Sequence, residues 1–314
     1  MNMKNNIIYI FSTFIIISCG GNYSGNEDTV LRSIKSPLFL VTDDKNVYKS
    51  KDAENWNSYS LTFTNSTSLN YFNKSFILTG MNGDGENLSF SKDGETWKNL
   101  KISSKTLESI VFRNGLYVVV GDMGVIYTSS DGLNWGEVNY ESDKQFHGVS
   151  FGNNIFVAVG RAGYIKTSPD SNTWTQRNSG ISEGLNEIIF VNNNFYISGS
   201  NGKILKSNDG ITWHILNTGI TNSLNSIAYG NEIFIAVGDS GTIIRSEDEE
   251  NWTKVNIESG YNKIINDIVY GNNIFVAVGG FGAILVSKNN GISWEEYSVG
   301  NLNSLKNISY KEDI

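Results

Sequence analysis

Cysteine and histidine are scarce in this chain, which limits the disulfides it can form and the general bases it can offer. Cys19 is the only cysteine among 314 residues, so no internal disulfide can form. The only histidines that could serve as general bases are His147 and His214. His147 enters a short apolar segment and His214 follows a recurring tryptophan. We therefore expect both to be ordinary polar residues rather than catalytic ones.

Basic residues are also too few for nucleic-acid binding. There are 24 Lys and Arg against 32 Asp and Glu, a net charge of −8, which argues against a phosphate backbone as partner. The chain has no dinucleotide-binding or phosphate-loop motif, so no cofactor is expected. Residues 83–87 (Gly-Asp-Gly-Glu-Asn) offer oxygen ligands without the spacing of a calcium loop. We interpret them as a long hairpin loop and predict no metal, although a metal site there stays open as an alternative.

No apolar run is long enough to span a bilayer. Ile7–Ile17, which follows Lys4, is eleven residues long, against the roughly 20 that a spanning helix needs. It ends in Ile-Ile-Ser-Cys-Gly at residues 16–20, which resembles a bacterial lipobox. We expect residues 1–18 to be a lipoprotein signal peptide and Cys19 to be lipidated. The alternative is an ordinary secretory peptide with an incidental cysteine.

Residues 19–36 are rich in Gly, Ser and Asn and are expected to form a flexible tether. Residues 20–22 contain no acidic residue. By resemblance to enterobacterial sorting rules, this favours the outer membrane or cell surface over the inner membrane. We therefore expect an exported monomer of the bacterial cell envelope, which contacts the membrane only through its lipid.

The most informative feature that is present is a repeated phrase, Ser-x-Asp-x-x-x-Trp. It ends at each of the seven tryptophans, and the steps between them are 41, 38, 39, 39, 39 and 42 residues. Such a period is typical of propellers and solenoids. The phrases contain Asp52 and Trp56, Asp93 and Trp97, Asp131 and Trp135, Asp170 and Trp174, Asp209 and Trp213, Asp248 and Trp252, and, in a variant one residue longer, Asn289 and Trp294.

Each repeat contains four short candidate strands, which we name a to d. Strand a is an Ile-x-Tyr segment such as 224–229, and strand b is a Phe-Val-Ala-Val segment such as 233–238. Strand c runs into the Ser-x-Asp phrase, and strand d follows the tryptophan. Strands this short, between Gly, Asn and Asp turns, predict an all-β fold. Strand b is apolar at nearly every position, as expected for a sheet covered on both faces.

The two ends of the chain supply complementary parts of one repeat. The first repeat begins at strand b with residues 38–41, while residues 305–310 at the far end copy strand a. We therefore predict that the C-terminal strand completes the first blade, since closure removes exposed sheet edges. The predicted domain is a seven-bladed β-propeller of four-stranded blades over residues 37–314.

The repeated phrase resembles the Asp-box of the BNR-repeat families. These include sialidases, sortilin-type receptors, xyloglucan-cleaving glycosidases and the photosystem II stability/assembly factor family. The role expected of the phrase is structural: Asp-Gly favours a tight hairpin turn, the carboxylate accepts backbone N–H groups, and the indole is wedged between neighbouring sheets. Where Ala53, Ser171 and Glu249 replace the glycine, we expect looser turns.

The resemblance also allows a sialidase-like activity to be weighed. Sialidases need three converging arginines and carry an Arg-Ile-Pro phrase, which is absent here. Arg113, Arg161, Arg177 and Arg245 fall at four different blade positions, so they are not expected to converge. In size and in its Gly-Asn-x-Ile-Phe-x-Ala-Val-Gly phrase the chain is most similar to the photosystem II stability/assembly factors. That resemblance implies a scaffold that holds a partner protein.

The loops between strands b and c are the predicted binding surface. They share a Gly-x-x-Gly frame with variable residues inside it, which is how a scaffold presents a binding surface. We expect Phe281 and Met123 to be apolar anchors and Arg161 to contact an acidic group; neutral loop residues are the alternative. The predicted ligand-binding residues are Asp122, Met123, Arg161, Asn201, Asp239 and Phe281.

Taken together, these features predict an envelope lipoprotein that binds a protein or glycan partner without catalysis. A glycan-active hydrolase of the sialidase-like superfold is the alternative, because carboxylates are too common in the chain to exclude it. A non-binding structural spacer is a third possibility. The sequence does not identify the partner.

Overall fold

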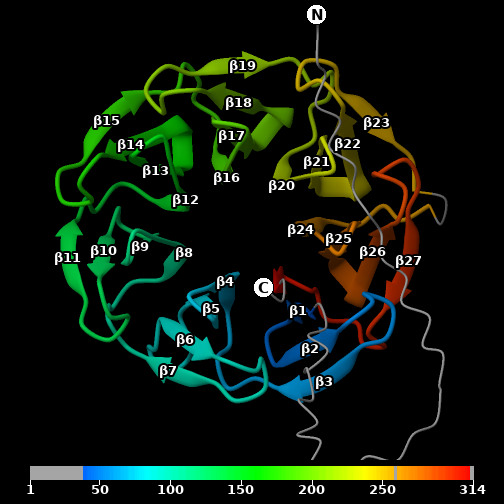
Figure 1. Cartoon of the computed structure of the whole chain (residues 1–314), viewed down its shortest axis with the longest axis horizontal. Helices are drawn as coiled ribbons and strands as arrows, with labels where there is room; N and C mark the ends of the chain where they lie inside the picture. The colour runs from blue at the N-terminus through cyan, green and yellow to red at the C-terminus, as the bar shows by residue number, and fades with distance from the viewer. Residues whose placement is uncertain (1–37, 258–259, 312–314) are drawn as a thin grey trace, which may run out of the picture. The chain divides into compact units, whose positions relative to one another are not determined.

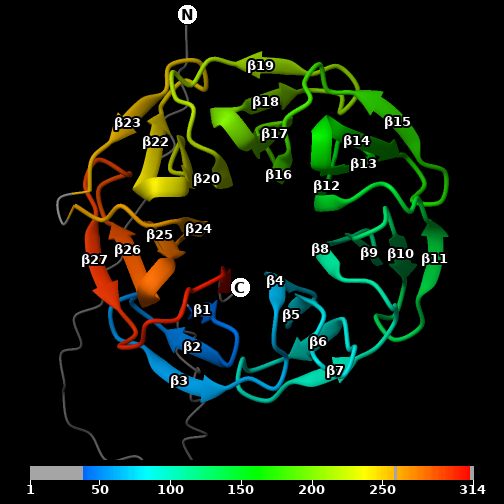
Figure 2. The same ribbon diagram turned by 180° about the vertical axis from the view of Figure 1, so that it is seen from behind.

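The computed structural model describes residues 38–257 and 260–311, which form seven four-stranded antiparallel sheets arranged around a channel (Figures 1 and 2). In six blades the strands run a, b, c, d from the channel outward in chain order. The predicted signal peptide, Cys19 and the tether lie outside the described residues. Among the described residues no helix is long and apolar enough to cross a membrane.

Strand bounds repeat closely from blade to blade. Blade 1 contains β28 (Asn307–Lys311), β1 (Leu38–Thr42), β2 (Asn46–Ser50) and β3 (Asn57–Ser60). Blade 2 contains β4 (Ser66–Phe72), β5 (Ser75–Gly80), β6 (Leu88–Ser91) and β7 (Lys98–Leu100). Blade 3 contains β8 (Leu107–Arg113), β9 (Leu116–Gly121), β10 (Ile126–Ser129) and β11 (Gly136–Asn139). Blade 4 contains β12 (Phe146–Gly152), β13 (Ile155–Gly160), β14 (Tyr164–Ser168) and β15 (Thr175–Asn178).

Blades 5 to 7 continue the pattern. Blade 5 contains β16 (Leu185–Val191), β17 (Asn194–Gly199), β18 (Ile204–Ser207) and β19 (His214–Leu216). Blade 6 contains β20 (Leu224–Gly230), β21 (Ile233–Gly238), β22 (Thr242–Ser246) and β23 (Thr253–Val255). Blade 7 contains β24 (Ile265–Gly271), β25 (Ile274–Gly279), β26 (Ala283–Ser287) and β27 (Glu295–Ser298).

The predicted closure of the ring is confirmed. β28 pairs antiparallel with β1, from Leu38 opposite Lys311 to Thr42 opposite Asn307. Beside this pairing, the buried Asp43 carboxylate accepts hydrogen bonds from the side-chain amides of Asn301 and Asn303, at 3.2 and 3.1 Å. Both ends of the described chain are therefore fastened into one blade.

The hydrophobic core is divided into seven clusters, one at each seam between neighbouring blades. Each cluster combines side chains of two blades and includes one tryptophan. Trp294, for example, packs between blades 6 and 7 with Ile235 and Phe275. The predicted wedging of the indoles between sheets is confirmed, which explains why one tryptophan recurs in each repeat.

The expectation of looser Asp-box turns is wrong. Ala53, Ser171 and Glu249 adopt φ of 63°, 65° and 70°, close to the 71° of Gly132 in the same position. Each turn is held by the same Asp carboxylate: Asp52 accepts the N–H groups of the second and third residues after it at 2.9 and 2.8 Å. These bonds impose the left-handed conformation even where the residue is not glycine.

Candidate functional site

The b–c loops of blades 3 to 7 share one backbone conformation. In blades 4 to 7 it is a single 3-10 turn: η1 (Arg161–Gly163), η2 (Ser200–Gly202), η3 (Asp239–Gly241) and η4 (Gly280–Gly282). The last glycine of each frame has positive φ, for example 69° at Gly282, a conformation that glycine adopts without steric cost. The first residue of the loop donates its N–H to a carbonyl in the connection that leads from strand d of the preceding blade into strand a of its own blade. Arg161, for example, donates to the Gln145 carbonyl at 3.0 Å. We call the end of the ring formed by the b–c loops and d–a connections the b–c face.

Phe281 stands out among the residues on these frames. Its side chain is 57% exposed, and its backbone has φ of 60°. Met123 occupies the equivalent position in blade 3, with 38% exposure and φ of 56°. Left-handed backbone costs about 1–2 kcal/mol for most residues but is tolerated by Asn, which occupies this position in blade 5 as Asn201 (φ 55°). Phe281 therefore carries backbone strain without gaining burial.

Neighbouring side chains frame both exposed anchors. The Lys263 ammonium lies 5.4 Å from the centre of the Phe281 ring, and Ile264 beside it is 41% exposed. On the other side of the propeller, in blade 3, the Tyr140 hydroxyl lies 3.8 Å from the Met123 sulfur. The b–c face thus carries two separate apolar positions, one on blade 7 and one on blade 3.

The other predicted binding residues do not gather into one pocket. The Asp122 carboxylate accepts a hydrogen bond from the Gln145 side-chain amide at 2.6 Å, and the Asp239 carboxylate accepts one from the Asn225 side-chain amide at 3.3 Å. Arg161 and Asn201 are exposed on separate blades. The six residues are spread over five consecutive blades, so they form a rim rather than a compact site.

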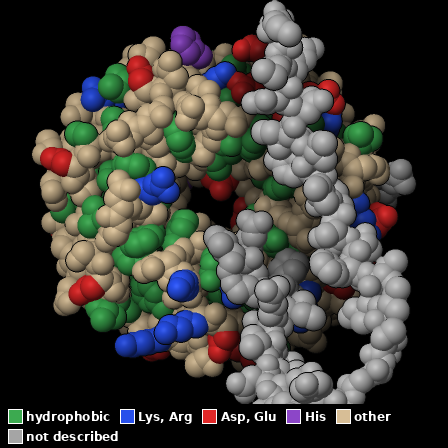
Figure 3. Space-filling view, viewed as in Figure 1, with side chains coloured by type: hydrophobic (Ala, Val, Ile, Leu, Met, Phe, Trp, Pro, Cys, Tyr) green, Lys and Arg blue, Asp and Glu red, His purple; other side chains and the backbone are tan. Residues whose placement is uncertain are grey.

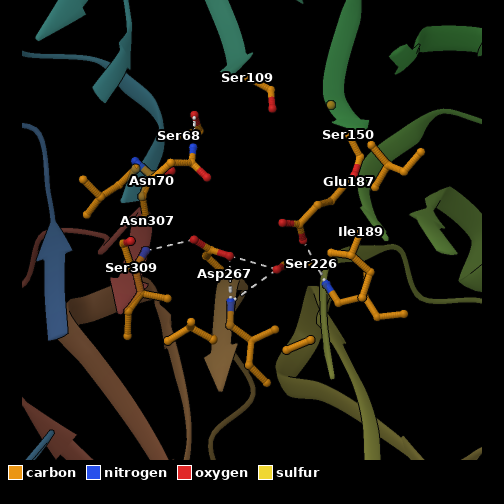
Figure 4. A pocket seen from close by; sticks show the side chains of 18 of the residues that line it. Ser68, Asn70, Ser109, Ser150, Glu187, Ile189, Ser226, Asp267, Asn307 and Ser309 are labelled. Atoms are coloured by element: carbon orange, nitrogen blue, oxygen red, sulfur yellow. Dashed lines mark hydrogen bonds between the residues drawn. The ribbon is translucent and has the colours of Figure 1, made fainter. Parts of the chain in front are cut away.

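The central channel holds a cavity with a volume of about 630 Å³. It is open in the space-filling view, and acidic side chains are visible on its wall (Figure 3). The lining comes from the seven a strands and from Lys306 just before β28, and it mixes hydroxyl and amide side chains with apolar ones. Ser68, Ser109, Ser150 and Asn307 are examples seen at close range (Figure 4).

Side chains of the a strands join neighbouring blades by hydrogen bonds to the backbone. At the second position of the strand, a side chain bonds to a backbone carbonyl at the start of the next blade's a strand or, for β28, just before it. Asn186, for example, donates to the carbonyl of Leu224 at 2.8 Å. The same bond is made by Thr67 to Leu107, by His147 to Leu185, by Asn225 to Ile265 and by Asn266 to Leu305. His147 must donate from Nδ1, because a carbonyl only accepts, so it serves as a structural donor.

Glu108 occupies that second position in blade 3, where an ionised carboxylate cannot donate. Burial, with the negative charge of Asp122 as a second cause, raises the pKa of Glu108 to about 7. The seam between blades 3 and 4 therefore differs from its neighbours in carrying a carboxyl group at this position.

Glu187, Ser226 and Asp267 occupy the third position of three consecutive a strands. Ser226 Oγ donates to Asp267 Oδ1 at 2.8 Å and accepts the Ile268 N–H at 3.3 Å. Glu187 accepts the Ile227 N–H at 2.9 Å, and its carboxyl also faces Ser226 (Figure 4). Asp267 Oδ2 accepts the Ile308 N–H of β28 at 2.8 Å. Burial raises the pKa of both carboxyls above the ordinary range.

The sequence reasoning missed these two carboxylates and the serine between them. A signal was present, because aligned a strands read Leu-Asn-Glu-Ile at 185–188 and Ile-Asn-Asp-Ile at 265–268, where the intervening repeat has Leu-Asn-Ser-Ile at 224–227. A carboxylate replacing a serine in an inward-facing strand could have been singled out. The hydrogen bonds that these side chains make to the backbone of the next blade could not be predicted from the spacing of residues in the sequence.

Hydrogen bonds of Asn82 and Glu86 hold the 83–87 loop to itself and to β7. Asn82 Oδ1 accepts the N–H groups of Asp84 and Glu86, and Glu86 Oε2 accepts the amides of Asn82 and Asn99. Within the part of the chain that the structure describes, no three His, Cys, Asp or Glu side chains are grouped so as to hold a metal ion. The loop is therefore organised by its own hydrogen bonds, as a hairpin loop is.

Comparison with known proteins supports the propeller fold. The family model of the DUF6242 beta propeller domain matches residues 140–254, from the connection before β12 into β23. No curated protein sequence matches the chain significantly.

Solved structures with the same fold include two of YCF48. The complex "YCF48 bound to D1 peptide" is 17% identical, with a TM-score of 0.60 over 78% of this chain and 90% of that one. YCF48 from Cyanidioschyzon merolae is 15% identical, with a TM-score of 0.57 over 85% and 90%. The computationally designed protein Ika8 is 13% identical, with a TM-score of 0.61 over 89% and 92%. The resemblance to photosystem II assembly factors is thus confirmed as a likeness of fold.

Proposed function

We propose that this protein is a non-catalytic scaffold that binds a segment of a partner protein on its b–c face. The observation that carries the proposal is Phe281, which is 57% exposed although its backbone is held at φ 60°. An exposed aromatic at a strained position contributes little to stability, so we infer that it is retained for contact with a partner. The peptide complex of a structurally similar propeller supports a protein as the partner class.

The alternative of a glycan-active hydrolase is less well supported. Such enzymes use two carboxyl groups that are free to act on the glycosidic bond. In the channel, Asp267 already accepts three hydrogen bonds and Glu187 accepts the Ile227 N–H. These bonds suit a structural role.

We further propose that the scaffold is exported and held at the bacterial cell envelope by a lipid on Cys19, with the outer membrane or cell surface favoured. The Ile-Ile-Ser-Cys-Gly sequence at 16–20 and the apolar run before it support this location. Radiolabelled palmitate should enter the wild-type protein and not the Cys19→Ala variant. Failure of the label to enter the wild type would refute the lipid anchor and would leave the proposed binding face unaffected.

The binding face can be tested by affinity capture from an envelope fraction of the host, using the wild type, Phe281→Ala/Arg161→Ala and Ile292→Ala. Ile292 is a matched control: it is apolar and 64% exposed, but lies in the c–d turn of blade 7. We expect the double variant to lose the captured protein and Ile292→Ala to keep it. Loss by Ile292→Ala with retention by the double variant would place the partner on the opposite face. A glycan array run with the same proteins separates a glycan from a protein ligand.

A further inference from the structure

We propose that Glu187 and Asp267 share one proton through Ser226, and that this proton fastens the seams joining blades 5, 6, 7 and 1. The inference concerns the channel and does not depend on the proposed binding function. It makes the closed ring sensitive to pH next to the blade in which β28 pairs with β1.

The hydrogen-bond donors decide where the proton resides. Asp267 accepts three donors: the Ser226 hydroxyl and the N–H groups of Ile268 and Ile308, each at 2.8 Å. A carboxylate with three donors is favoured in its charged form. Glu187 has one backbone donor, Ile227, and lies beside a second carboxylate on the channel wall, where both residues are half-buried. Two charges there repel, so Glu187 is the group that holds the proton.

Ser226 connects the two groups because its hydroxyl can satisfy both at once. It has one hydrogen, which it donates to Asp267, and two lone pairs. One lone pair accepts the Ile268 N–H. The other is available to a protonated Glu187, whose carboxyl faces it (Figure 4). The resulting chain runs from Glu187 to Ser226 to Asp267 to the Ile308 N–H, and so from blade 5 into the C-terminal strand.

No cation on the channel wall offsets this pair within the described residues. The other charged or titratable side chains of the lining, tyrosines apart, are Glu108 on β8, His147 on β12 and Lys306 on the connection before β28. Glu108 is acidic, and His147 is bonded to the Leu185 carbonyl. Lys306 is paired with Asp44. The pair therefore depends on its own proton for neutralisation.

The direction of the pH effect follows from linkage. Folding raises the carboxyl pKa, so the folded state holds a proton that the unfolded chain releases above about pH 4–5. The stabilisation is complete below that range and is lost as pH rises through the folded pKa. While Glu187 stays protonated, the unfolding constant should rise about tenfold per pH unit.

The test is urea unfolding from about pH 5 to about pH 9 of the wild type, Glu187→Gln and a surface control, Glu296→Gln, on the exposed face of β27. The glutamine amide introduced by Glu187→Gln would donate to Ser226 and accept from Ile227 at every pH, as the protonated glutamate does. We expect Glu187→Gln to fold and to lose about one proton's worth of the pH dependence of the unfolding free energy. Glu296→Gln should keep the wild-type pH dependence. The protection factor of the Ile308 amide, which corrects for the intrinsic rise of exchange with pH, should fall at high pH in the wild type only.

A second measurement keeps the proposal testable if Glu187→Gln does not fold. Carbon-13 NMR of labelled carboxyl groups in the wild type should show one carboxyl of the pair still protonated near neutral pH, and Asp267→Asn should lower the pKa of the remaining Glu187. A wild-type slope in folded Glu187→Gln, or two carboxyls that both ionise at ordinary pKa values, would overturn the proposal.

Discussion

Removal of the C-terminal strand should unfold the whole propeller rather than only its first blade. Deleting residues 303–314 removes β28 and so uncovers the backbone edge of β1, which otherwise pairs along its whole length from Leu38 to Thr42. It also removes Leu305 and Ile308, which are 0% and 4% exposed in the cluster between blades 7 and 1.

The size of the effect can be worked from these contacts. Burial of Leu305 and Ile308 contributes about 1.5–3 kcal/mol each. Asp267 Oδ2 loses the Ile308 N–H, its hydrogen-bond donor, on a half-buried side chain, which costs about 1–3 kcal/mol more. The sum is about 4–9 kcal/mol, against about 5–15 kcal/mol for the whole stability of a typical domain. We therefore expect the truncated protein to be largely unfolded or aggregated at room temperature.

Circular dichroism melting and size-exclusion chromatography measure this directly. Deletion of residues 20–33, which precede the described residues, is the control and should leave the melting temperature unchanged. A synthetic peptide of residues 303–314 should restore a cooperative transition to the truncated chain, and the same peptide with Ile308→Asp should not. Equal melting of the full-length and C-terminally truncated proteins would refute the shared blade.

Three further predictions concern individual side chains. Because the pKa of Glu108 is raised to about 7, its stabilising contribution is present at low pH and lost as pH rises through that value; Glu108→Gln should therefore raise the urea midpoint at alkaline pH and leave it unchanged at acidic pH. Gly230→Ala would place a Cβ 2.0 Å from Cγ of Tyr270 in the next blade and should cost about 1–3 kcal/mol in urea unfolding, whereas Gly136→Ala, which meets nothing within 4 Å, should cost little. Phe281→Asn should raise stability by about 1 kcal/mol, because Asn tolerates the left-handed backbone, while weakening capture of the partner; unchanged capture would count against Phe281 as an anchor.

The ring could be predicted from the sequence because its periodic signals are local. One tryptophan per 38–42 residues marks each seam, and the split repeat at the two ends predicts the pairing of β28 with β1. The turns at Ala53 and Glu249 were mispredicted because the missing glycine was given more weight than the Asp-box hydrogen bonds, which hold positive φ for other residues as well. The Glu187–Ser226–Asp267 chain was missed because each member acts on the backbone of the next blade, about 40 residues away.

The central claim, that a partner protein binds the b–c face, is tested most directly by site-specific photocrosslinking in the host. A photoreactive phenylalanine analogue is placed at Phe281 in one strain and at Ile292 in another, two apolar positions of similar exposure, 57% and 64%, in the b–c and c–d turns of blade 7. We predict a discrete crosslinked protein from position 281 and none from position 292. A crosslink from position 292 with none from position 281 would contradict the claim.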